Sequence, residues 1–158
     1  MALASGELLP ESRASCLEGQ DGGVLGLVRA HAQRAPGGAA LFWHRGPSGG
    51  AWAAHEAGED ETWSYRAVWM AGCRAATALR TALRQHCQLK AADSEVLGHR
   101  IGVMISGGVA LPLVELAILL IGCSVVPLDP EDPPARLQLL LEDAELVAAV
   151  VSGAEAAA

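Results

Sequence analysis

The stretch "CSVVPLDPEDPPARL" (residues 123–137) is a short apolar run followed by four prolines and three acids. Proline fixes φ and lacks a backbone N–H, so Pro127 and Pro130 exclude "PLDP" from the middle of a sheet and end a strand at 124–126. An acid before proline is typical of a helix start, so Asp132 is the predicted N-cap and Pro133 and Pro134 occupy the first turn. The stretch therefore predicts a strand, a rigid turn and a new helix.

The residues after this turn continue the alternation of helix and strand. Leu137, Leu140, Leu141 and Ala144 repeat at the spacing of one helical face. The apolar run 146–151 then predicts a further strand.

Upstream, the pattern predicts a helix and a hairpin. A helix starts at Val24 and is closed by Pro36, and "AALFW" (39–43) is a plausible strand. The glycine-rich segment 44–60 predicts a loop insertion, and "ETWSY" (61–65) predicts the returning strand. An amphipathic helix follows with Ser64 as its N-cap, and its apolar face comprises Tyr65, Val68, Trp69, Gly72, Ala76, Leu79 and Leu83.

The centre of the chain predicts a strand and a nearly all-apolar helix. Residues 86–99 are a polar connection, 100–106 a strand, Gly107-Gly108 a turn and 109–121 a helix that Gly122 ends as its C-cap. Continuous apolar strands alternating with helices indicate an α/β fold, with a mostly parallel sheet covered by helices on both faces.

Composition limits the domain organisation and the function classes. The chain has 158 residues and a net charge of −7, with one lysine, Lys90, and no basic stripe, so nucleic-acid binding is not expected. Its four cysteines are far apart, which favours reduced thiols, and no secretory signal is recognisable, so we expect a cytoplasmic protein. We expect flexible tails at 1–23 and 153–158 around one folded segment, 24–152.

A membrane span is the alternative for the apolar region around the central helix. From Ile101 to Leu128 the only side chain that is charged at neutral pH is Glu115. The uninterrupted helical part would be about 16 Å long at ~1.5 Å per residue, whereas the hydrocarbon core measures ~30 Å. A buried helix is favoured, so we do not expect a membrane as a partner.

Four segments resemble the beginning of the adenylate-forming enzymes, the AMP-binding family that includes acyl-CoA synthetases and adenylation domains of peptide synthetases. They are "RAHAQRAP" with "AALFW", "TWSYRAV", "RIGVMISGG" and "LAILLIGCSVVPLDPEDPPARLQLLLEDA". The last is the specific one. Its fixed structural points fall on Gly122, Pro127, Asp129, Pro130, Pro133, Arg136, Leu137 and Asp143.

The chain also departs from the family pattern. Leu120 stands where lysine is usual, Val125 where tyrosine is frequent, and Gly107 where asparagine is frequent. "GGVALPLVELAIL" and "DPEDPPARL" most resemble the branch of the beta-alanine-activating enzyme. The resemblance implies the incomplete N-terminal portion of this fold.

The resemblance implies a ligase that uses ATP and Mg²⁺ to activate a carboxylate and then transfers it to a thiol. In this family a Ser/Thr/Gly-rich loop with lysine, an aromatic-Gly-x-Thr-Glu stretch, an aspartate and a late lysine supply the site, and none occurs here. Ser152-Gly153 lacks the threonines and the lysine, and no Walker-type loop is present. We therefore predict no catalytic, cofactor-binding or metal-ligating residue in this chain, whose partner would be the remainder of the adenylation domain.

Several other candidates have ordinary interpretations as surface, packing or turn residues. They are Lys90, the neighbours His86 and Cys87, the acid Glu115, the acidic group Glu142, Asp143 and Glu145, and the Gly107-Gly108 turn as an anion site. The alternative function is a non-catalytic scaffold or interaction module, because the central helix and the last strand would leave apolar surface and an unpaired edge.

Overall fold

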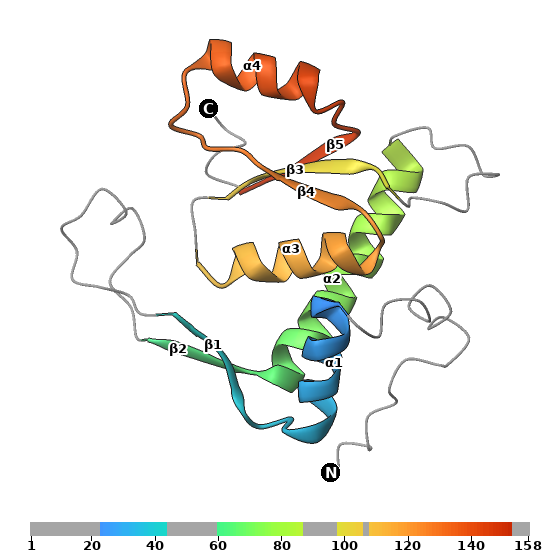
Figure 1. The fold of residues 1–158 in the computed structure, drawn as a ribbon, viewed down its shortest axis with the longest axis vertical. Coiled ribbons are helices and arrows are strands. Elements are labelled where there is room, and N and C mark those ends of the chain that lie inside the picture. The colour runs from blue at the N-terminus through green and yellow to red at the C-terminus, as the bar shows by residue number, and fades with distance from the viewer. Residues whose placement is uncertain (1–22, 44–59, 87–97, 106–107, 153–158) are drawn as a thin grey trace.

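A computed structural model of the chain describes residues 23–43, 60–86, 98–105 and 108–152. The predicted 44–60 insertion and both predicted tails lie almost entirely outside these residues, so the domain boundaries stay predictions. Figure 1 shows the elements, which in chain order are α1 (Val24–Arg34), β1 (Ala39–Trp43), β2 (Glu61–Ser64), α2 (Tyr65–His86), β3 (Arg100–Met104), α3 (Ala110–Leu120), β4 (Ser124–Pro127), α4 (Pro134–Asp143) and β5 (Ala148–Val151).

The sheet formed by β3, β4 and β5 is parallel, with β3 between the other two strands. Ile101 is paired with Val125 on one side and with Ala148 on the other. The β3–β4 crossover passes through α3, and the β4–β5 crossover returns across β3 through α4. Crossovers between parallel strands are right-handed, so two crossovers that run in opposite directions along a sheet place their helices on opposite faces. Figure 1 shows this arrangement for α3 and α4. The predicted α/β class is therefore confirmed.

The main core lies between the parallel sheet and the helices α2 and α3. Ile101 and Val103 point from β3 into a cluster with Leu83 of α2 and Ile118 of α3. Ile101 and Ile118 are completely buried. The nearly all-apolar α3 is therefore a core helix, and no helix in the described part of the chain is long and apolar enough to cross a membrane.

A second cluster joins α1 and the hairpin to the other end of α2. Leu25, Val68 and Leu116 form its buried centre, and Leu41 and Trp63 of the antiparallel hairpin pack against it. The predicted N-cap at Ser64 is confirmed, because its Oγ accepts a hydrogen bond of 3.2 Å from the backbone N–H of Ala67.

The prediction that Asp132 caps α4 is wrong. The N-cap is Pro133, with φ −55° and ψ 139°, and no side chain caps this helix. A residue that precedes proline is disfavoured in the helical region, so Pro134 keeps Pro133 extended and moves the helix start one residue along the chain. Asp132 therefore lies one position too early to accept a hydrogen bond as an N-cap.

Strand boundaries also differ slightly from expectation. β3 ends at Met104, and β5 begins at Ala148 rather than at residue 146. β4 includes Pro127, which a sheet tolerates because β4 is an edge strand among the described residues.

Candidate functional site: the corner between β4 and α4

Residues 127–136, in the middle of the segment that carries the sequence resemblance, form a corner stabilised by hydrogen bonds. The backbone N–H of Leu128 donates to the carbonyl oxygen of Val103 at 2.9 Å, which extends the sheet one residue beyond β4. Asp129 Oδ1 then accepts from the backbone N–H of Glu131 at 2.9 Å. Asx turns of this kind replace a backbone bond by a side-chain bond, so Asp129 fixes the direction in which the chain leaves the sheet.

Leu128 anchors this corner to the central strand. It is buried, and a Cβ added to Gly102 of β3 would lie 2.8 Å from Leu128 Cδ1 and 2.9 Å from Leu146 Cδ1. Leu128 and Leu146 therefore cover β3 on the α4 side of the sheet. Sequence reasoning missed both leucines, although a glycine inside a strand is a known sign of close approach.

Asp132 and Arg136 form an ion pair across the first turn of α4. The Arg136 Nε to Asp132 Oδ1 distance is 3.3 Å, and the arginine side chain is 67% exposed. An exposed pair of this kind contributes about 0–1 kcal/mol. Asp143 is also exposed, at the end of α4.

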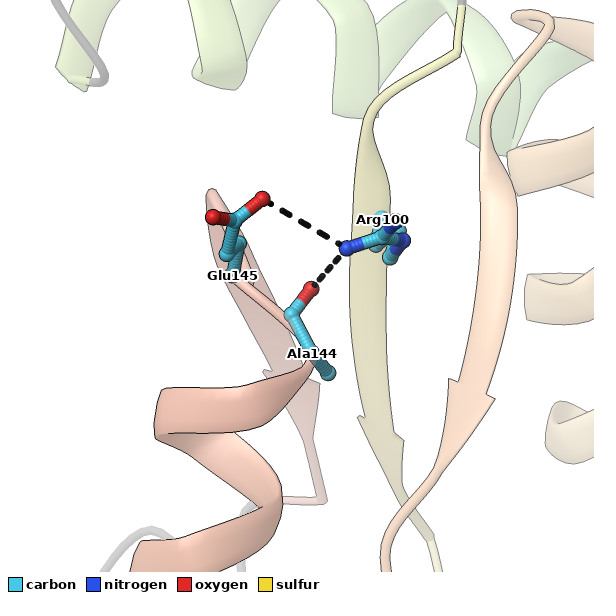
Figure 2. Close-up of polar contacts among 3 residues, drawn as sticks. All are labelled: Arg100, Ala144 and Glu145. Carbon is cyan, nitrogen blue, oxygen red and sulfur yellow. Dashed lines mark hydrogen bonds and ion pairs between the residues drawn. The ribbon is translucent and has the colours of Figure 1, made fainter.

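Arg100 ties the start of β3 to the end of α4, as Figure 2 shows. Its NH1 group donates to the carbonyl oxygen of Ala144 at 3.0 Å and lies 3.6 Å from Glu145 Oε2. The cation thus interacts favourably with the carboxyl end of the helix dipole. Glu145 has φ 47°, the left-handed region that non-glycine residues rarely occupy. These residues are 44 positions apart or more, so no local pattern indicated the contact.

Gly122 connects α3 to β4 in the left-handed conformation, with φ 79°. The backbone N–H of Gly122 donates to the carbonyl oxygen of Leu119 at 3.0 Å, and that of Cys123 donates to Ile118 at 3.1 Å. These two bonds make a Schellman motif, which satisfies carbonyls at the end of the helix. The predicted C-cap role of Gly122 is confirmed.

Replacing Gly122 with valine is expected to lower the free energy of unfolding by about 1–2 kcal/mol, because a β-branched side chain is disfavoured at positive φ. Urea unfolding measures the change. Gly37→Val is the matched control, since an added Cβ at Gly37 meets nothing within 4 Å. Equal midpoints for Gly122→Val and the wild type would contradict this role.

The remaining candidate residues do not converge on one place. Glu115 is half-buried on α3. Burial raises the pKa of the Cys73 and Cys123 thiols, which makes both thiols poor nucleophiles. His86 ends α2, whereas Cys87, Lys90 and Gly107 lie outside the described residues.

No three His, Cys, Asp or Glu side chains among the described residues come together as a metal site would require. The cation at the corner, Arg136, is paired with Asp132. The corner joins two layers of the fold, the parallel sheet and α4.

The corner and the parallel sheet have the arrangement expected for the beginning of an adenylate-forming fold. The comparison with known proteins agrees with this class. The family model described as "AMP-binding enzyme" matches residues 28–158. The chain belongs to the AMP-binding enzyme family. No curated protein matches the sequence.

Solved structures of adenylate-forming enzymes share the fold. A fatty acid AMP ligase from Legionella pneumophila is 17% identical with a TM-score of 0.61, over 82% of this chain and 19% of that one. A four-domain nonribosomal peptide synthetase, AB3403 bound to AMP and glycine, is 25% identical with a TM-score of 0.60, over 84% and 8%. The N-terminal subdomain of Klebsiella oxytoca NpsA, in complex with anthranilyl-AMSN, is 17% identical with a TM-score of 0.60, over 81% and 26%. This chain thus spans about a quarter or less of each of these relatives.

Proposed function

We propose that this chain is the N-terminal segment of an ATP-dependent ligase that converts a carboxylic acid into an acyl adenylate. The observation that carries the proposal is the segment 116–144, whose sequence follows the family without a gap. It folds as the end of α3, β4, the proline corner and α4.

In this proposal the segment has a structural role and the reaction takes place elsewhere. ATP, Mg²⁺, the carboxylate and the accepting thiol would bind to the remainder of the adenylation domain, in the cytoplasm. The more particular resemblance to the beta-alanine-activating branch stays a prediction, because the residues that would line a carboxylate pocket are not in this chain.

The 158-residue chain alone is expected to give no carboxylate-dependent ATP–pyrophosphate exchange, because it lacks the phosphate loop and the catalytic lysine of the family. The assay uses a panel of amino acids, aryl acids and fatty acids, with an intact adenylation domain as the positive control. Measurable exchange by the short chain would show that it contains a nucleotide site.

Sequencing of the full-length transcript tests the proposal directly. A reading frame that continues past Ala158 into a Ser/Thr/Gly loop with lysine supports it. A stop codon directly after Ala158 would instead favour the second candidate, a non-catalytic interaction module, which the large exposed fraction of Phe42, 64%, favours.

A further inference from the structure

We propose that the remainder of the N-terminal subdomain packs into an apolar groove between β1 and the start of α3, beside Phe42 and Trp43. The inference rests on the proposed function, and it specifies where on this segment the missing part of the domain docks. The groove is separate from the corner between β4 and α4.

The groove is lined by apolar side chains from two elements far apart in the sequence. Leu41, Phe42 and Trp43 come from β1, Leu111 and Pro112 come from the first turn of α3, and Gly108 and Val109 come directly before that helix. The cavity measures about 140 Å³. An apolar cavity of roughly 150 Å³ holds one benzene molecule, so this groove has room for one large apolar side chain.

At the end of β1, Phe42 is mostly exposed and Trp43 is partly exposed. Ala40 and Leu41, in the same strand, pack against the second core cluster, whereas Phe42 and Trp43 do not belong to it. Phe42 is 64% exposed and Trp43 36%. Neighbouring residues of a strand point to opposite faces, so Phe42 and Trp43 expose apolar surface on both sides of this end of β1.

The hairpin packs against the second cluster through Ala40, Leu41 and Trp63. It has two strands, separate from the parallel sheet, and a two-stranded hairpin is marginally stable in water without additional packing. The end of the hairpin that carries Phe42 and Trp43, opposite Thr62 and Glu61, is the end that lies outside the second cluster. An apolar segment in the groove would stabilise this end.

The relatives indicate which polypeptide supplies that segment. This chain corresponds to 26% of the NpsA N-terminal subdomain, so most of a comparable subdomain is further polypeptide that must pack against this quarter. No charged residue is among the described residues that line the groove, which suits an apolar stretch of a domain core. In the longer protein the rest of the subdomain would occupy the groove, so a second copy of this chain could not bind there at the same time.

Hydrogen exchange tests the inference on two polypeptides, the 158-residue chain and the longer product of the full-length transcript. Amide exchange in β1 (Ala39–Trp43) is expected to be about tenfold slower or more in the longer product, because the groove is then covered. Exchange in α1 (Val24–Arg34) is the internal reference.

A matched pair of variants in the longer product assigns the protection to the groove. Phe42→Asp is expected to abolish the extra protection of β1. Leu27→Asp, at a residue 59% exposed on α1, is expected to retain it.

The outcomes separate this inference from the proposed function. A stop codon after Ala158 would overturn both. A longer product with nucleotide-activating motifs but unprotected β1 amides would overturn only the docking site. A third outcome is that protection of β1 rises with the concentration of the 158-residue chain alone. This result would assign the groove to a second copy of the chain, and it would also overturn the docking site.

Discussion

Replacement of Ile118 with alanine is expected to lower the free energy of unfolding by about 2–5 kcal/mol, as large-to-small changes in protein cores do. Ile118 is completely buried, and it lies between α2 and the parallel sheet in the cluster that contains Leu83 and Ile101. The substitution removes apolar contacts and leaves a cavity that a tightly packed helix cannot close. Denaturant unfolding followed by circular dichroism measures the change.

Leu27→Ala on α1 is the control for Ile118→Ala. Leu27 is 59% exposed, so its truncation is expected to change the free energy of unfolding by less than about 0.5 kcal/mol. Similar midpoints for the two variants would mean that α3 does not form the centre of the core.

Replacement of Gly72 with leucine is expected to destabilise the protein by about 1–3 kcal/mol, the usual cost of overpacking. A Cβ at Gly72 would lie 2.6 Å from Leu116 Cδ2 and 3.0 Å from Leu116 Cγ. The glycine therefore lets α2 and α3 approach closely. Leucine has a better helix propensity than glycine by up to about 1 kcal/mol, so a net loss of stability requires that the clash outweighs this gain.

A double-mutant cycle with Leu116→Ala identifies the cause of that loss. Because Leu116 supplies the atoms that the new side chain would meet, the double variant is expected to be more stable than additivity predicts, by about 0.5–3 kcal/mol. Strict additivity would show that Gly72→Leu acts through something other than the contact with Leu116.

The corner between β4 and α4 has a structural explanation that does not require a ligand. Asp129 directs the chain out of the sheet, Leu128 fills the space above Gly102, and the prolines keep the helix start at a fixed place. A corner of this kind fixes the position of α4 relative to the parallel sheet. In the proposed ligase it would position the segment against which the reactive part of the domain folds.

The sequence by itself determined the local elements of this protein. The proline positions and the helical spacing of leucines predicted the order of helices and strands, and Gly122 predicted the left-handed cap, because each depends on neighbours within a few residues. The parallel class followed from that order of elements. The error at Asp132 also has a local cause, since Pro134 keeps Pro133 extended.

Only the tertiary structure decided which distant segments meet. The strand order β4-β3-β5, the contact of Arg100 with the end of α4, the cover that Leu128 and Leu146 give to Gly102, and the groove beside Phe42 each join residues far apart in the chain. Such contacts depend on how whole layers pack, and a periodic pattern records which face of an element is apolar but not the surface that it meets.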